Sequence, residues 1–230
     1  MNIAWGITGA GHLLKDTFAV MEELKKEHRI TVFLSGGGEE VLKAYGLWGR
    51  LNEICPGDYL EEIITSLSEG KSAPTTGRFF LKKYDMLIVS PATTNTVAKI
   101  VCGISDTLVT NAVSHAMKSM IPVYIVPVDQ KEEEKETVLP NYVDRDICEN
   151  CAKCPPQKIC DTVAFGDRKI DLLKCTACGD CVFVCEHGAV ISGKVVKLKV
   201  RKVDAENVEK LRKMEFITVL ESPEKIKNTV

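Results

Sequence analysis

The sequence lacks an excess of charge of either sign. Of its 230 residues, 30 are Lys or Arg and 32 are Asp or Glu, which leaves a net charge of -2. A chain without a basic surplus has no field that favours nucleic acid or an anionic membrane over other partners. We therefore expect neither a nucleic acid nor a membrane partner, and expect soluble proteins and small molecules instead.

The sequence also lacks the features that direct a chain out of the cytoplasm. The segment Met1–Thr8 has no charged start followed by a long apolar run, and no later apolar stretch is long enough to cross a bilayer. We expect a cytoplasmic protein. In that reducing compartment the ten cysteines of the chain indicate metal ligation or redox chemistry rather than disulfides.

What is present, over residues 1 to about 128, is an alternation of short apolar runs with amphipathic stretches. This rhythm is typical of βαβ units and predicts a doubly wound α/β domain with a parallel sheet, flavodoxin-like or Rossmann-like. A helix with a period of 3.6 follows the first strand and carries Leu13, Phe18 and Leu24 on one face. The predicted strands are Ile3–Thr8, Ile30–Leu34, Met86–Val89, Thr107–Val109 and Val123–Val126.

Three further segments organise the chain. Residues 71–77 read as a loop. The charge run 131–136 breaks the periodicity before the clustered cysteines, and we interpret it as a domain boundary, a solvated linker or a helix face. After the cysteines, residues 204–214 read as a short helix and 216–220 as a strand that could pack back on the first domain.

Eight of the cysteines form two runs. The second run has the C-x2-C-x2-C-x3-C spacing of bacterial ferredoxins, and the first has the same triplet with five residues before its fourth cysteine. Residues 148–192 therefore resemble a two-cluster ferredoxin, in which the fourth cysteine of each run ligates the other [4Fe–4S] cluster. The resemblance implies one cluster on Cys148, Cys151, Cys154 and Cys185 and a second on Cys160, Cys175, Cys178 and Cys181.

This segment departs from the ferredoxin pattern in two ways. Asp161 and Glu186 replace the usual proline after each fourth cysteine, and two residues are inserted after Cys154. A pair of structural zinc sites is the competing interpretation. A tetrahedral zinc site, however, does not require two interleaved triplets of cysteines, each with a distant fourth ligand. Cys55 and Cys102 stand alone in apolar surroundings, and we expect buried, inert thiols there.

Two glycine-rich turns suit a phosphate. Gly6–Gly11 lies where the first strand meets a helix, so its bare amides and the helix N-terminus could hold an anion. The second strand ends in Ser35–Gly38 rather than in the acidic residue that would take an adenosine ribose, which disfavours NAD and FAD. A mononucleotide fits better, although two ordinary glycine-rich turns would look the same.

The stretch Val89–Leu108 decides between these readings. It resembles the signature of the flavoprotein family that includes cysteine decarboxylases, archaeoflavoproteins and dihydromethanopterin reductases, whose equivalent segment wraps FMN. The resemblance implies that the phosphate and ribitol side is served by Thr8, Gly9, Ala10, Gly11 and Ser35. It implies that the isoalloxazine and ribityl side is served by Ala92, Thr93, Thr94, Asn95 and Thr96.

The chain also departs from that family. No histidine stands at residues 74–80, where decarboxylase members carry a catalytic one, so decarboxylation is disfavoured. Where those members have a Pro-x-Met-Asn clamp, this chain reads Pro127–Gln130, so its substrate must differ. His12 and His115 lie near expected flavin-facing ends of elements, but lone histidines are more often surface or satisfied core residues. No catalytic side chain is identified.

The combination of a flavin domain with a ferredoxin-type segment resembles the archaeal iron–sulfur form of dihydromethanopterin reductase. The resemblance implies that ferredoxin, or a similar one-electron donor, feeds the clusters and that reduced FMN delivers hydride to the C=N bond of a dihydropterin. Two alternatives remain: an electron-transfer archaeoflavoprotein without a pterin substrate, and a decarboxylase or prenyl-transferring enzyme.

These inferences give a division of the chain and an expected assembly. We expect an FMN-binding domain over 1–143, a small α+β domain of the bacterial-ferredoxin type with two clusters over 144–200, and a C-terminal helix and strand over 201–230. We also expect a homo-oligomer, trimeric or built from trimers. An open sheet edge exposes a flavin unless a neighbouring subunit covers it.

Overall fold

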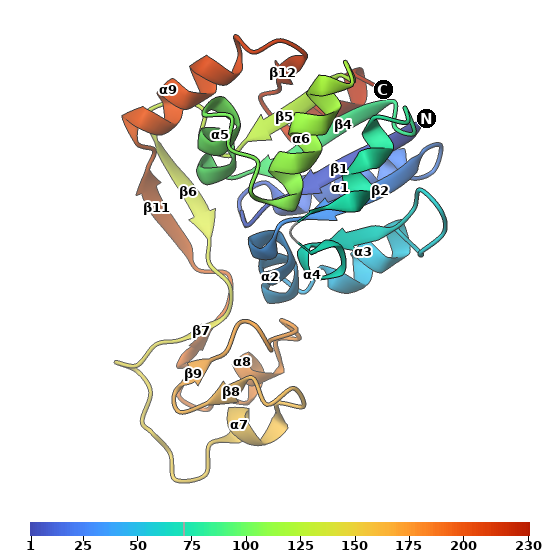
Figure 1. Ribbon diagram of the computed structural model, residues 1–230. Coiled ribbons are helices and arrows are strands. Elements are labelled where there is room, and N and C mark those ends of the chain that lie inside the picture. The colour runs from blue at the N-terminus through green and yellow to red at the C-terminus, as the bar shows by residue number, and fades with distance from the viewer. Residues whose placement is uncertain (71) are drawn as a thin grey trace.

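The computed structural model describes residues 1–70 and 72–230. An α/β part stands at the top of Figure 1, a small part rich in loops lies below it, and a long two-stranded ribbon connects them. Within these described ranges no helix has both the length and the apolar character needed to span a membrane. Lys71, the first residue of the expected loop, lies outside the described residues.

The central sheet has strand order β12-β5-β4-β1-β2-β3 in the described chain, and all its pairs are parallel. The predicted doubly wound sheet is confirmed. Its strands are β1 (Asn2–Ile7), β2 (Arg29–Leu34), β3 (Ile63–Thr65), β4 (Met86–Ala92), β5 (Val123–Pro127) and β12 (Ile217–Val219). The order reverses between β1 and β4, and ligands of such sheets bind outside the carboxyl ends of the strands at that point.

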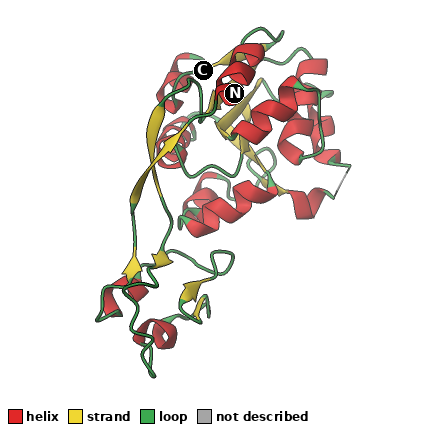
Figure 2. Ribbon diagram, turned by 90° about the vertical axis from the view of Figure 1, so that its left-hand side faces the viewer, coloured by secondary structure: helices red, strands yellow, loops and turns green. Residues whose placement is uncertain are grey.

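Helices cover both faces of the sheet (Figure 2). The sheet part of the chain contains α1 (Leu14–Leu24), α2 (Gly36–Ala44), α3 (Trp48–Ile54), α4 (Ser66–Glu69), α5 (Thr94–Val101), α6 (Leu108–Lys118), α9 (Lys202–Leu211) and the 3-10 helices η1 (Pro74–Phe79) and η2 (Pro223–Asn228). Successive strand residues alternate between two cores: Trp5 and Ile88 pack with α1, whereas Ala4 and Leu87 pack with α6. Apolar burial on both faces is what the near-continuous apolar strands predict.

The predicted strand over Thr107–Val109 is wrong, because these residues begin α6. The Thr107 side chain accepts a hydrogen bond from the Thr110 amide and caps the helix. Leu108, Val109 and Ala112 then fall on one buried helical face. A three-residue apolar run does not separate strand from helix, and here the capping threonine decides. Likewise part of the expected 71–77 loop is the start of η1.

The charge run at 131–136 is neither a free linker nor a helix face. Its second half enters β6 (Glu134–Val138), which pairs antiparallel with β11 (Val195–Lys199). Lys199 lies opposite Glu134 and Lys197 lies opposite Glu136, so opposite charges face each other across the ribbon. The predicted C-terminal helix and strand are confirmed as α9 and β12, and β12 joins the sheet beside β5.

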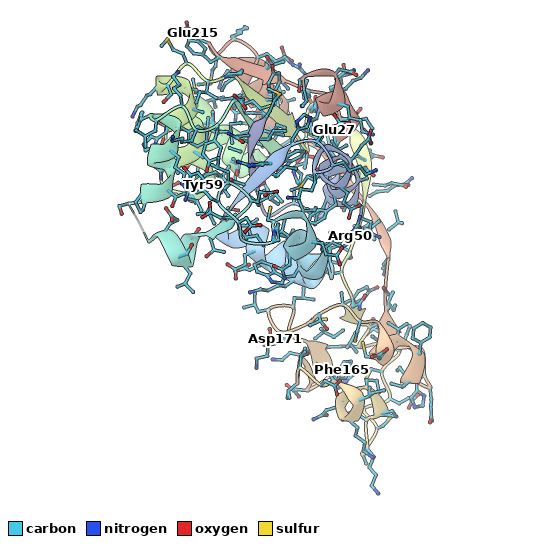
Figure 3. The ribbon with its side chains drawn as sticks, turned by 90° about the vertical axis from the view of Figure 1, so that its right-hand side faces the viewer. Glu27, Arg50, Tyr59, Phe165, Asp171 and Glu215 are labelled. Atoms are coloured by element: carbon cyan, nitrogen blue, oxygen red, sulfur yellow. The ribbon has the colours of Figure 1, made fainter. Side chains whose placement is uncertain are left out.

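Beyond the ribbon lies the cysteine-rich part, in which Figure 3 labels Phe165 and Asp171. It contains β7 (Tyr142–Val143), α7 (Pro155–Ile159), β8 (Phe165–Gly166), β9 (Lys169–Ile170), α8 (Asp180–Val184) and β10 (Val190–Ile191). Strand β7 pairs with β10 and β8 with β9, both antiparallel. The two residues inserted after Cys154 fall in α7, which this cysteine precedes directly.

Candidate redox site

The carboxyl edge of the sheet brings together the loops that the sequence assigns to the flavin. The Thr8 hydroxyl at the end of β1 donates to the Pro91 carbonyl at 2.7 Å and accepts from the Thr93 amide at 2.8 Å. Only 1% of Thr8 is exposed. The hydroxyl of Thr8 thus joins two loops. Because its proton is already donated to Pro91, Thr8 can line the site but has no free O–H donor for a ligand.

The second glycine-rich turn meets the first one at the same edge. Ser35 caps α2, because its hydroxyl accepts from the Gly38 amide at 3.0 Å. A Cβ on Gly9 would lie 3.1 Å from the backbone of Gly37, so the two turns touch through bare backbone. Gly36 and Gly37 are exposed at the N-terminus of α2, where the amides and the helix dipole favour an anion.

The signature segment closes the other side of this edge. Thr93 caps α5 through a hydrogen bond from the Thr96 amide, so the motif becomes the first turn of a helix. Ala92 and Thr96 are buried, Thr94 is half-buried and Asn95 is exposed. Ala10 is buried in the opposite turn. The flavin roles of these residues stay predictions, and the structure places them around one edge.

The two histidines singled out from the sequence lie in different places in the structure. His12 lines a cavity between the α/β part and the cysteine-rich part, and burial, with Lys135 second, lowers its pKa. The expected position of His115 is wrong. It lies near the C-terminus of α6, which leads into the amino end of β5, and its ring stacks on Phe80 at 4.6 Å between centroids. His115 is therefore at the edge opposite to the flavin loops.

Two cavities in the small part are lined by the clustered cysteines. In the described residues no three His, Cys, Asp or Glu side chains converge closely enough for a single metal ion. One cavity is lined by Cys148, Cys151, Cys154 and Cys185, together with Arg168 and Glu186. The other is lined by Cys160, Cys175, Cys178 and Cys181.

The thiols that line the second cavity affect one another's pKa values. Burial, followed by the neighbouring Cys175, Cys178 and Cys160, raises the pKa of Cys181 to about 11. Burial, the nearby Cys178 and the nearby Cys160 also raise the pKa of Cys175. A nearby cationic centre would favour the thiolate forms of Cys175 and Cys181, which burial disfavours.

The two remaining cysteines behave differently from each other. Cys55 is buried, its Sγ donates to the Ile30 carbonyl at 3.1 Å, and burial raises its pKa to about 12. It is the inert thiol that the sequence predicts. Cys102 is exposed at the C-terminus of α5, so the expectation of burial is wrong there.

Sequence reasoning missed one contact between the two parts. Gly46, just after α2, packs on Thr176 of the cysteine-rich part. The preceding residue, Tyr45, donates its hydroxyl to the Val138 carbonyl of the ribbon at 2.6 Å. The only signal along the sequence is a glycine after a helix, which ordinarily marks a C-terminal cap.

Comparisons with known proteins agree with this architecture. The profile of the Flavoprotein family matches residues 1–140, and that of the 4Fe-4S binding domain matches residues 168–191. The dihydromethanopterin reductase (acceptor) of Methanosarcina mazei is 48% identical over 98% of this chain and 97% of its own length. The protein of the same name from Methanocaldococcus jannaschii is also 48% identical, over 98% of this chain and 94% of its own length.

A solved structure resembles the whole chain. It is Burkholderia xenovorans DmrB in complex with FMN, described as a cubic protein cage for redox transfer, with 26% identity and a TM-score of 0.63 over 99% of this chain and 91% of that chain. The match of the family profile over more than half of the sequence, and the 48% identity along nearly all of it, lead to one conclusion. The chain belongs to the Flavoprotein family and is an iron–sulfur member of it, related to the dihydromethanopterin reductases (acceptor).

Proposed function

We propose that this protein is an oxidoreductase that reduces the C=N bond of dihydromethanopterin. Electrons come from ferredoxin or a similar one-electron donor and pass through two [4Fe–4S] clusters to FMN. One observation carries the proposal: eight cysteines line two separate cavities, and a ribbon joins that part of the chain to the sheet, at whose carboxyl edge two glycine-rich turns meet. The 48% identity to reductases of that name supports the choice of substrate.

The residues at the sheet edge fit FMN. The exposed amides of Gly36 and Gly37 at the start of α2 suit a terminal phosphate, and Ser35 holds that turn in place. Asn95 offers a donor and an acceptor to the polar rim of the flavin ring. Bound there, FMN converts single electrons into a hydride equivalent. The remaining proposed contacts are Thr8, Gly9, Ala10, Gly11, Ala92, Thr93, Thr94 and Thr96.

The cysteine cavities fit iron–sulfur clusters. Each cavity is lined by three cysteines of one run and the fourth of the other run, which is the exchange of ligands seen in two-cluster ferredoxins. We propose Cys148, Cys151, Cys154 and Cys185 for one cluster and Cys160, Cys175, Cys178 and Cys181 for the other. The division of the chain at 143/144 and 200/201 belongs to the same proposal.

The proposal extends to assembly and location. We propose a cytoplasmic homo-oligomer, a trimer or an assembly of trimers, in which a neighbouring subunit covers each flavin. The cage described for Burkholderia xenovorans DmrB supports it. Light scattering of the protein with FMN bound should give a mass well above 25.4 kDa, and a stable monomer that keeps FMN would contradict the proposal.

The function is tested by reoxidation under anaerobic conditions. Protein reduced with ferredoxin is mixed with dihydromethanopterin, and the flavin absorbance is followed while tetrahydromethanopterin is assayed. Flavin reoxidation with at least one product per flavin, and up to two when both clusters are also reduced, supports the reductase. A flavin that stays reduced with the pterin, yet is reoxidised by another redox protein, supports the alternative of an electron-transfer protein without a pterin substrate.

A further inference from the structure

The loop between Cys175 and Cys178 contacts the α/β part directly. A Cβ on Gly46 would lie 3.1 Å from the Thr176 carbonyl oxygen and 3.3 Å from the Ala177 Cβ. Gly46 has a φ of +67°, which suits glycine, and the close approach of the second loop excludes a side chain there for a second reason. The end of α2 thus abuts the backbone that carries two cysteines of one quartet.

Tyr45 continues this contact inward to the flavin loop. A Cβ on Gly11 would lie 2.3 Å from the Tyr45 Oη and 2.5 Å from its Cζ, so the ring packs on bare Gly11 backbone. The Tyr45 hydroxyl also donates to the Val138 carbonyl in β6 at 2.6 Å. The ring is held between the β1–α1 turn and the ribbon, and burial raises its pKa, so it stays protonated at neutral pH.

The two quartets differ in their position relative to this contact. Thr176 and the cysteines of the 160/175/178/181 quartet line the same cavity, and that loop touches Gly46. The Cys175 amide of this quartet also donates to the Asp171 carbonyl at 3.0 Å, and Figure 3 shows Asp171 on the side of the small part towards the α/β part. The other quartet lines a separate cavity, whose lining includes neither Thr176 nor Ala177. One quartet therefore lies beside the α/β part, and the other does not share this contact.

We propose that Tyr45 and Gly46 form the electron-transfer contact between the 160/175/178/181 quartet and the flavin of the same chain. That quartet holds the inner cluster, and the quartet with Cys148 holds the outer cluster, which accepts electrons from the external donor. This inference rests on the proposed function. Electron transfer weakens steeply with distance and is faster through packed atoms than across a gap, and the continuous packing from Thr176 to Gly11 is such a path.

The electrons balance along this path. Reduction of one C=N bond takes two electrons and two protons, whereas each cluster carries one electron at a time. Two molecules of the one-electron donor are therefore oxidised for each dihydropterin reduced. Both electrons would cross the Tyr45–Gly46 contact in succession, and a bound flavin would supply the conversion from single electrons to hydride.

A matched pair of glycine variants tests the contact. Gly46→Ala and Gly103→Ala both place a methyl group at positive φ after a helix, with φ values of +67° and +70°. A Cβ on Gly103 meets nothing within 4 Å, whereas one on Gly46 meets the cluster loop. Both variants should keep the iron, sulfide and FMN contents of the parent protein. Amide exchange over residues 175–178 should speed up only in Gly46→Ala.

Stopped-flow absorbance after mixing with reduced ferredoxin then separates cluster reduction from flavin reduction. In Gly46→Ala and in Tyr45→Leu we expect flavin reduction to slow by about tenfold or more, while cluster reduction keeps its rate. Tyr45→Phe, which retains the ring, and Gly103→Ala should match the parent. Flavin reduction at the parental rate in both Gly46→Ala and Tyr45→Leu would overturn the inference, since electrons would then reach the flavin elsewhere. Slow flavin reduction in these two variants, together with a parent protein whose flavin is reduced normally but does not turn over the pterin, would instead count against the proposed function alone.

Discussion

Substitution of Thr8 is a specific test of the sheet edge that we propose for FMN. The buried Thr8 hydroxyl joins β1 to the loop after β4 by donating to the Pro91 carbonyl and accepting from the Thr93 amide. Thr8→Val keeps the shape of the side chain and removes both hydrogen bonds. The Pro91 carbonyl still accepts the Thr8 amide at 3.3 Å, so the main loss is the acceptor for the Thr93 N–H.

The expected cost follows from that one orphaned group. A fully buried, unsatisfied N–H costs about 1–3 kcal/mol, and Thr93 is half-buried, so we expect the free energy of unfolding of Thr8→Val to fall by at least about 1 kcal/mol. The same loosening moves the segment that would hold the flavin, and its Kd for FMN should rise about tenfold, equivalent to about 1.4 kcal/mol. Thr8→Ser keeps the hydroxyl and loses one buried methyl group, at about 1 kcal/mol of stability.

Two measurements check this. Urea unfolding followed by circular dichroism gives the stability, and titration of apoprotein with FMN, followed by flavin fluorescence, gives the Kd. Thr8→Ser should bind FMN within about twofold of the parent protein. If Thr8→Val bound FMN as tightly as Thr8→Ser, the loop that Thr8 fastens would not form the flavin site, and the reasoning would be refuted.

Three further predictions concern the clusters, the flavin and pH. Cys178→Ser should lower the iron content by about half while FMN stays bound; loss of both cofactors would indicate one integrated site. Asn95→Ala should weaken FMN binding by about 1–3 kcal/mol, which raises the Kd by about fivefold or more, without changing the stability of the apoprotein, because Asn95 is exposed; an unchanged Kd would remove Asn95 from the site. The Arg78 side chain lowers the pKa of Glu62 below 4.5, so their pairing stabilises the fold above that pH and is lost as the pH falls through the lowered pKa. Glu62→Gln should therefore lose less Tm than the parent between about pH 5 and 3, and equal losses would refute this role.

The architecture could be predicted because its signals are local. Buried parallel strands such as β1 and β4 read as continuous apolar runs, and the turn after each strand carries glycine or capping residues. The cysteine spacing resembles that of two-cluster ferredoxins, and this resemblance implies two quartets that each take their fourth ligand from the other run. The strand predicted at 107–109 is wrong because its few apolar residues suit either a strand or a helix. The capping threonine is also a weaker signal for a helix than the β-branched residues nearby are for a strand.

The contacts that join the two parts could not be predicted. Tyr45 meets Gly11 and Val138 across many intervening residues, and Gly46 meets a loop more than a hundred residues away. Nothing in a single sequence distinguishes this glycine from an ordinary helix cap. The charge run around Glu134 read as a solvated segment because its pairing partners in β11 lie far along the chain.

The cofactor content tests the central claim most directly. Protein purified under strict anaerobic conditions should contain about eight iron, about eight acid-labile sulfide and about one FMN per chain. The flavin should be released by heat without an adenine group. Zinc without sulfide, about four iron per chain, or stoichiometric FAD would contradict the account of two four-iron clusters feeding one FMN.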